Sequence, residues 1–443
     1  MQRHNAKIFG FCGGHIVLKL ADITKALILS AVFTWPCVLY AQNYDDPGLG
    51  EKPVSAHPQD YKPLGIRAGS FMLHPGVQLA AEFTDNVFYT QNLKQSDTIF
   101  HIRPYISAQS TWSSHSLNVK LAADIARYAD YDFRNYEDYF LIVNGQVDVK
   151  NRSYFSYGGQ IMNLHEGLGD RNSEQSLLEP TRYMLYGANI GYDHTFNRLS
   201  LGAMLTWTRL DFDNVNSLIE DEINNEDRDR DAYNWSLRAG YQFRAGIQAF
   251  ASYSSGTVKY DEQLDRNGYD RSGDGYMFNG GLAFALTGKL NGDISARYVN
   301  RSYEDPLLPD TSGWGGGAGL GWTPTYLTTV YARIDTSVQE TTSQYASGYL
   351  RTLYSVRVDH ELTRFLQING FASYSNNNYQ LIEDAPVFAR DVDKISRYGI
   401  GLSWFINRHL FLNVSYDHEK LKTNLPDDGY DVNRVWLTLG IER

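Results

Sequence analysis

The side chains with the clearest capacity for chemistry are charged residues that interrupt apolar runs at every second position. Arg238, for example, lies between Leu237 and Ala239 in the segment YNWSLRAGYQF. Because residues i and i+2 of an extended strand share one face, the charged and apolar side chains are expected on opposite faces. The same alternation assigns twelve side chains to the polar face, which we expect to line a lumen: Lys120, Asp124, Asp148, Arg238, Asp293, Arg297, Arg333, Asp335, Arg357, Asp359, Arg397 and Asp417.

A polar face of this composition can solvate or bind a hydrophilic solute. Both signs of charge are present, so the face is expected to be mixed rather than strongly selective for one charge. Arginine and tyrosine side chains could follow a polysaccharide by hydrogen bonding to hydroxyls and stacking on sugar faces. The competing interpretation is structural: these charges keep the lumen wet and bridge neighbouring strands, since wall charges pair readily.

Sequence patterns typical of catalysis and metal binding are absent. There is no G-x-S-x-G and no H-E-x-x-H motif. The segment DRNGYDRSGDG from Asp265 is rich in oxygen ligands but lacks the spacing of a calcium loop. The histidines are scattered along the chain: His165, His194, His360, His409 and His418. The sequence therefore predicts no catalytic residue, no metal site and no cofactor, although a triad is defined by geometry and could join distant strands.

The elements that must carry these residues are strands. About eighteen segments of the chain show the period-two alternation of a half-buried strand between turn residues. Clear examples are residues 117–126, 139–149, 199–207, 233–243, 290–299, 327–335, 354–359 and 434–441.

The connections between these segments alternate between short and long. Long polar connections begin at His165, Asp213, Asp261 and Leu381. Short ones centre near Ser113, Asn151, Asn197, Ala245, Gly288, Pro324, Thr363 and Arg408. Short periplasmic turns and long outer loops are typical of an outer-membrane barrel. The fold predicted is all-β: a transmembrane antiparallel β-barrel of about eighteen strands.

Aromatic residues separate this barrel from a soluble all-β fold such as a propeller. Tyr and Trp favour the membrane interface, because an apolar ring carries one polar tip. They gather at the ends of the predicted strands, as in Tyr192, Trp207, Trp322, Trp404 and Tyr416. A propeller would also repeat a short motif in each blade, and none is found.

The N-terminus is expected to be a signal peptide covering residues 1–41, with an apolar run from Ala26 to Ala41 after four basic residues. The alternative is an uncleaved anchor helix. Both cysteines, Cys12 and Cys37, fall inside this segment. Residues 42–69 are expected to form a periplasmic lead-in or to fold into the lumen, and residues 70–443 the barrel. The net charge of −11 argues against nucleic acid as a partner.

The first expected strand ends in Asp85-Asn86-Val87-Phe88, followed by a polar loop and a second strand that contains Pro104. This corner resembles the opening of the putative β-barrel porin 2 family, whose members begin with a strand ending in DNV(F/Y). The resemblance implies an outer-membrane pore, often encoded beside exopolysaccharide assembly systems. Asp85 and Asn86 are expected to cap the corner by side-chain bonds to the backbone.

Together these observations predict a pore in the cell outer membrane, most simply a passive conduit for exopolysaccharide or capsule export. Three alternatives stay open: a porin for small solutes, a plugged structural or surface barrel, and an outer-membrane hydrolase. The expected partners are outer-membrane lipid and lipopolysaccharide, together with a polysaccharide and a periplasmic export protein.

Overall fold

Alternating apolar and polar residues form nineteen strands in the computed structural model, which describes residues 61–443 except 151, 174–178 and 217–221. Two short 3-10 helices, η2 (Asp132–Arg134) and η3 (Glu226–Arg228), lie between strands. The strands are β1 (Ile66–Ala68), β2 (Phe71–Thr84), β3 (Asp97–Ser110), β4 (His115–Tyr128), β5 (Tyr136–Lys150), β6 (Ser153–His165), β7 (Arg182–Phe196), β8 (Leu199–Phe212), β9 (Arg230–Arg244), β10 (Ile247–Tyr260), β11 (Gly273–Thr287), β12 (Leu290–Arg301), β13 (Thr311–Thr325), β14 (Thr328–Glu340), β15 (Ala346–Thr363), β16 (Leu366–Leu381), β17 (Val392–Asn407), β18 (Leu410–Thr423) and β19 (Tyr430–Glu442).

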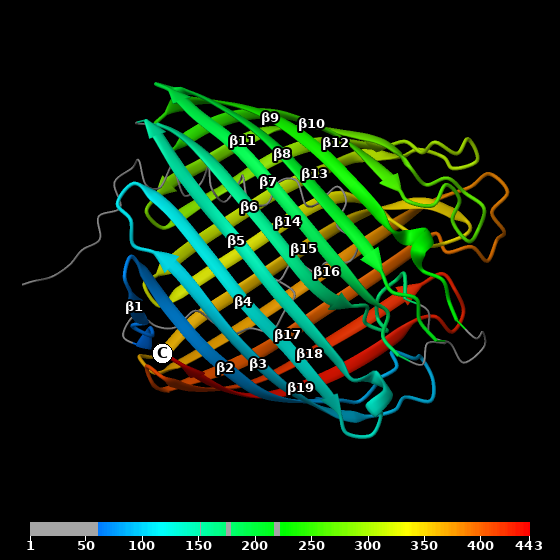
Figure 1. Ribbon diagram of the computed structural model, residues 1–443, viewed down its shortest axis with the longest axis horizontal. Helices are drawn as coiled ribbons and strands as arrows, with labels where there is room; N and C mark the ends of the chain where they lie inside the picture. The colour runs from blue at the N-terminus through cyan, green and yellow to red at the C-terminus, as the bar shows by residue number, and fades with distance from the viewer. Residues whose placement is uncertain (1–60, 151, 174–178, 217–221) are drawn as a thin grey trace, which may run out of the picture. The chain divides into compact units, whose positions relative to one another are not determined.

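Strands β2 to β19 close into a barrel (Figure 1). Each strand pairs antiparallel with its neighbour in sequence, and β19 pairs with β2 in a register that sets Leu439 opposite Leu79. Strand β1 pairs only with the start of β2. An unpaired backbone group costs several kcal/mol in hydrocarbon, so a sheet in a membrane must have no edge. The prediction of an antiparallel barrel of about eighteen strands is confirmed.

The two ends of the barrel differ in the length of their connections. Eight turns of two to four residues lie at the end that also holds the start of β2 and the end of β19, and nine longer loops lie at the other end (Figure 1). Gly246 in one turn has a φ of +77°, and a Cβ there would lie 2.4 Å from the Ala285 carbonyl oxygen. Long loops mark the extracellular end of an outer-membrane barrel.

The outer face of the wall carries large apolar side chains. On β17, Tyr398, Ile400, Leu402, Trp404 and Ile406 alternate along the strand and are 41–52% exposed. So much contiguous exposed apolar surface requires an apolar environment, which lipid supplies. No helix of the described residues has the length and apolarity needed to cross a bilayer.

The inner face carries the side chains that alternate with the outward ones along each strand. Phe405 and Phe411 lie between the outward residues of β17 and β18, and Tyr61 packs against Phe405 with 6.0 Å between ring centroids. Tyr61 thus contacts the inner wall near the short turns. The predicted signal peptide, residues 1–41, and most of the predicted lead-in lie outside the described residues. The chain divides by contacts into residues 1–35 and 36–443, and every described residue belongs to the second unit.

Candidate functional site

The twelve charged residues expected to line the lumen have the parity of the inner face. Their neighbours in sequence form the exposed apolar surface: Leu237 beside Arg238 is 52% exposed, and Tyr398 beside Arg397 is 50% exposed. The strand registers then decide which of these charges meet. Most of them form ion pairs along one strand, between neighbouring strands or, in one case, across an intervening strand.

Three of these pairs involve residues on the first and middle strands. Asp124 accepts a hydrogen bond from Arg103 Nε at 2.8 Å and contacts His101 Nδ1 at 2.9 Å. Arg357 pairs with Asp359 two residues further along β15 at 3.0 Å. Arg297 Nη1 lies 3.0 Å from Asp335 Oδ1, and Arg333 lies 3.6 Å from the same oxygen.

The Arg297–Asp335 pair spans an intervening strand, β13. The inner face of β13 consists of glycines, and the Arg297 guanidinium lies over Gly317, where a Cβ would meet Nη2 at 2.2 Å. A side chain at this position would displace the guanidinium of the β12 arginine, which crosses the bare backbone to reach β14.

A second cluster of ion pairs joins β17, β18 and β19. Glu419 accepts hydrogen bonds from Arg397 Nε at 2.9 Å, from Arg434 Nη2 at 2.9 Å and from the Tyr430 hydroxyl at 2.7 Å. Asp417 accepts from Arg434 Nε at 2.8 Å and from the Trp436 indole at 3.1 Å. Two cations and two anions therefore neutralise each other on this part of the wall.

The other four of the twelve residues have different surroundings. Within the described part of the chain, Lys120 and Asp293 have no ion pair, and Asp148 accepts a hydrogen bond from Gln146 at 2.5 Å. Arg238 lies over the Phe250 ring at 4.0 Å.

Polar groups without charge also line the inner wall, on β9, β10 and β11. Asn234, Ser254 and Asn279 are buried, and their side chains include polar atoms with no partner among the described residues. Buried amides and hydroxyls normally find partners. These atoms are buried, and a bound water molecule is the partner that could satisfy them.

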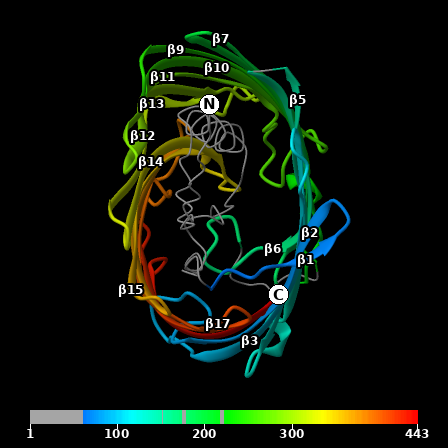
Figure 2. The same ribbon diagram turned by 90° about the vertical axis from the view of Figure 1, so that its left-hand side faces the viewer.

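The extracellular mouth is crossed by the loop between β6 and β7, residues 166–181, of which 174–178 are not described. Asn172 Oδ1 accepts hydrogen bonds from Thr342 N at 3.1 Å and from its hydroxyl at 3.4 Å. Thr342 lies in the loop between β14 and β15, eight positions away in a ring of eighteen. In Figure 2, which looks along the barrel, the segment after β6 accordingly lies inside the ring of strands.

The crossing loop is also held on both sides. On the far side, Arg171 lies 3.6 Å from Asp428, and its carbonyl accepts a hydrogen bond from Arg390 at 3.4 Å. On the near side, Glu166 forms a buried bidentate pair with Arg228 in the next loop. Arg228 in turn lies 4.0 Å above the Phe212 ring.

Phe212 belongs to an apolar cluster on the inner wall. Its buried members are Met162, Leu164, Leu185, Leu210 and Phe212, from β6, β7 and β8. These residues lie at the ends of the strands next to the long loops. The loops therefore pack on an apolar surface inside the mouth. This burial stabilises the inward position of the loops by removing apolar area from water.

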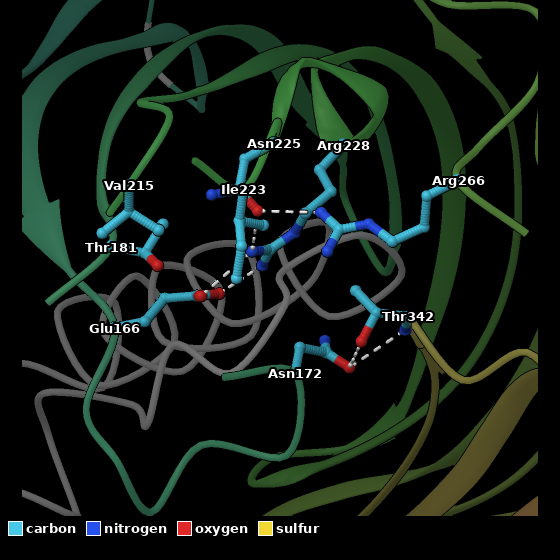
Figure 3. Close-up of a pocket in the computed structure, with 9 residues that line it drawn as sticks. All are labelled: Glu166, Asn172, Thr181, Val215, Ile223, Asn225, Arg228, Arg266 and Thr342. Carbon is cyan, nitrogen blue, oxygen red and sulfur yellow. Dashed lines mark hydrogen bonds and ion pairs between the residues drawn. The ribbon is translucent and has the colours of Figure 1, made fainter. Parts of the chain in front are cut away.

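A small cavity lies among these loops (Figure 3). It is lined by Glu166, Asn172, Thr181, Val215, Ile223, Asn225, Arg228, Arg266 and Thr342, and the Glu166–Arg228 and Asn172–Thr342 contacts cross it. Its volume is about 50 Å³, which holds a few water molecules. The loops are therefore packed together at this side of the mouth.

Arginines connect the remaining loops. Arg271 bonds Asp265 at 2.6 Å and donates to the backbone carbonyls of Ser343 and Ala346. Arg301 pairs with Glu340 at 2.9 Å and donates to the Arg271 carbonyl. Asp265 of the segment rich in oxygen ligands thus binds an arginine. The described residues contain no group of three or more His, Cys, Asp or Glu that could hold a metal ion.

Asp229 and Tyr89 are two of the loop residues whose pKa values are displaced. Burial raises the pKa of Asp229 to about 7, and the neighbouring Asp211 carboxylate adds to the rise. Burial likewise raises the pKa of Tyr89 to about 12. Its hydroxyl accepts a hydrogen bond from Arg434 at 2.7 Å, which ties the β2–β3 loop to the inner wall.

The corner at Asp85 and Asn86 is built from side-chain bonds to the backbone. Asn86 is fully buried, donates to the carbonyls of Thr90 at 2.7 Å and Asp431 at 2.9 Å, and accepts from Thr90 N at 3.1 Å. Asp85 accepts from the Asn433 backbone at 2.7 Å. The corner therefore closes the seam between β2 and β19 at the outer rim.

Sequence reasoning did not single out several of these residues. Arg103, Glu419 and Arg434 follow the same alternation as the twelve predicted charges and could have been found by it. The pairs Glu166–Arg228, Arg271–Asp265 and Arg301–Glu340 involve loop residues, for which period-two patterning gives no signal.

A family model described as putative beta-barrel porin 2 matches residues 57–443. No curated protein matches the chain.

Solved structures of outer-membrane proteins are similar at low identity. The outer membrane protein OpdK of Pseudomonas aeruginosa is 12% identical with a TM-score of 0.41, covering 84% of this chain and 99% of its own. OccAB3 of Acinetobacter baumannii is 11% identical with a TM-score of 0.44, covering 85% and 100%. The siderophore receptor PirA of the same organism is 6% identical with a TM-score of 0.43, covering 84% and 80%.

Proposed function

This chain belongs to the putative beta-barrel porin 2 family and forms an outer-membrane barrel, and from that premise we propose that it is a passive conduit for an exopolysaccharide leaving the cell. The proposal concerns the solute and the direction of transport. The periplasmic partner is then an export protein that contacts the end of the barrel with the short turns. Residues 61–69 lead into β2 at that end.

The observation that supports this solute class is the composition of the inner wall. Its charges are largely neutralised in pairs such as Arg297–Asp335, while Asn234, Ser254 and Asn279 hold polar atoms that have no partner among the described residues. A wall with hydrogen-bonding capacity and little net charge suits a solute rich in hydroxyl groups. Charged solutes would meet attraction and repulsion in nearly equal measure.

A second candidate, a porin for small hydrophilic solutes, is favoured by the mouth. The loop from Glu166 to Thr181 crosses it and is pinned by Arg228 on one side and Thr342 on the other. A small solute can pass beside such a loop, whereas a polymer requires more width. Under the export proposal, therefore, this loop moves during transport.

Planar-bilayer recording of the purified protein tests these functions. We expect an open conductance level that the native polymer, added at the short-turn side, blocks reversibly. The variant Asn234→Ala/Asn279→Ala should weaken the block, whereas Asn376→Ala on the outer face of β16 should not.

The other outcomes identify the alternatives. An open level that the polymer leaves unchanged, together with sugar permeation in liposome swelling, would establish a small-solute porin. A protein that never opens would be a plugged structural barrel.

A further inference from the structure

Three lysines gather on the outer face of β17 and β18 at the extracellular rim. Lys394, Lys420 and Lys422 are exposed and have the same strand parity as Tyr398 and Val414, which belong to the outer surface. We call these three residues the lysine patch. The patch is unusual in a chain whose net charge is −11.

The strand register holds these like charges together. Lys394 lies directly opposite Lys422 in the β17–β18 pairing, and Lys420 lies one residue pair further along the same face. Side chains in directly opposed positions have Cβ atoms about 5 Å apart, and like charges there are destabilising. The register therefore concentrates positive charge at a cost that something outside the strand pair must offset.

One carboxylate on the same face, Asp431, lies beside the patch in the strand register, and it already binds a lysine outside the patch. Lys394, Lys420 and Lys422 have no ion pair among the described residues. Asp431, opposite Lys420 on β19, is bound by Lys94 at 2.7 Å, which brings a fourth lysine to this rim. The neighbouring acids Asp393 and Glu419 are buried on the inner face.

Elsewhere around the ring, outward positive charges near the same rim are paired with carboxylates. On β8, the outward Arg209 pairs with Asp231 at 3.1 Å and with Asp261 at 2.7 Å. Lys259 on β10 lies opposite Asp231. Outward cations at β8–β10 therefore have carboxylate partners, whereas Lys394 and Lys422 at β17–β18 have no ion pair among the described residues.

The depth of the patch points to lipid headgroups. Lys394 lies four residues beyond Tyr398, and Lys420 four residues beyond Tyr416, which is about 13 Å along each strand. Tyrosines mark the membrane interface, so a cation just beyond them meets the headgroup layer. In the outer leaflet of this membrane that layer carries the phosphates of lipopolysaccharide.

We propose that the lysine patch binds the lipid A phosphates of a lipopolysaccharide molecule, with its acyl chains lying on the apolar surface below. A phosphate between Lys394 and Lys422 turns a repulsive pair into two charge-assisted contacts. The lipid anchors the β17–β18 hairpin in the outer leaflet. This inference depends on the barrel and its membrane, and it holds whatever the solute.

Binding of purified lipopolysaccharide to the full-length protein in neutral detergent tests the proposal. The variant Lys394→Gln/Lys420→Gln/Lys422→Gln should weaken binding by roughly tenfold or more. The matched control Lys289→Gln/Arg364→Gln/Arg408→Gln removes the same charge from exposed short-turn residues and should leave binding unchanged. Replacing the three lysines by arginine should preserve it.

Two further arms identify the ligand chemistry. Lipopolysaccharide with dephosphorylated lipid A should bind weakly, and phosphatidylglycerol vesicles should compete poorly. Equal affinity of the glutamine variant and the native protein would overturn the proposal, as would equal binding of the dephosphorylated lipid or of phosphatidylglycerol. Heat-modifiable migration on gels would show that each variant is a folded barrel.

Discussion

Asp229 lies in the barrel mouth, and its buried position there raises the pKa of its carboxyl group above the usual value for aspartate. It accepts a hydrogen bond from Phe212 N at 2.7 Å at the point where η3 leads into β9. Burial raises its pKa from 3.8 to about 7, with Asp211 adding repulsion. The native protein therefore holds a proton here that the unfolded chain releases.

This proton makes stability depend on pH in a definite direction. Between about pH 4 and pH 7 the native state binds more protons than the unfolded state, so stability falls as pH rises through this window. We expect a loss of about 1–4 kcal/mol attributable to Asp229, which is buried, given 1.36 kcal/mol per pKa unit.

Denaturant unfolding in detergent at pH 4.5, 6 and 8 measures this dependence. Asp229→Asn keeps an acceptor for Phe212 N without ionising, and it should flatten the pH profile. Asp132→Asn, which changes an exposed loop carboxylate, should retain the native slope. The idea fails if Asp229→Asn leaves the profile unchanged.

At the scale of one element, the glycine-lined inner face of β13 allows two other strands to interact. Arg297 of β12 crosses β13 over Gly317 to reach Asp335 of β14. Gly316, one residue away, faces outward, and a Cβ there would find its nearest neighbour at 3.8 Å. The two adjacent glycines therefore differ in what they permit.

Replacing each of these glycines by alanine separates the two roles. Gly317→Ala should displace the Arg297 guanidinium into the lumen and lower stability by about 1–3 kcal/mol, the usual cost of overpacking. The freed arginine should also shift the reversal potential toward anion selectivity. Gly316→Ala should be neutral in both measurements, and equal effects of the two variants would contradict this account.

At the scale of the whole molecule, the mouth depends on contacts between opposite sides of the ring. Asn172 and Thr342 touch although their loops leave the wall eight strands apart. No strand pairing brings these residues together, so the contact exists only because the crossing loop spans the mouth. It can break without disturbing the wall.

A disulfide across the mouth tests this arrangement. With Cys12 and Cys37 replaced by serine, the variant Asn172→Cys/Thr342→Cys should oxidise to a cross-linked form with a lower conductance, restored by a thiol reductant. Asn172→Cys alone should conduct as the native protein does. Failure of the pair to cross-link while the barrel is folded would show that the loop does not reach the opposite side.

The sequence alone was enough to predict the wall. Strand number, strand parity and the short turns near Asn197 and Arg408 all follow from period-two alternation, because adjacent residues of a strand must face opposite sides. The same alternation assigned the twelve charged residues to one face. It is a local property, since each strand repeats it without reference to the others.

Only the tertiary structure decided which charges meet and what closes the mouth. The pairing of Arg297 with Asp335 depends on the register of three strands, and that of Asn172 with Thr342 on the curvature that closes the ring. The Lys394–Lys422 apposition likewise depends on the register of β17 with β18. Register and closure are collective properties of the barrel, whereas alternation is a property of each strand separately. For that physical reason the sequence determined which side chains face each side of the wall. The tertiary structure determined which of them are in contact.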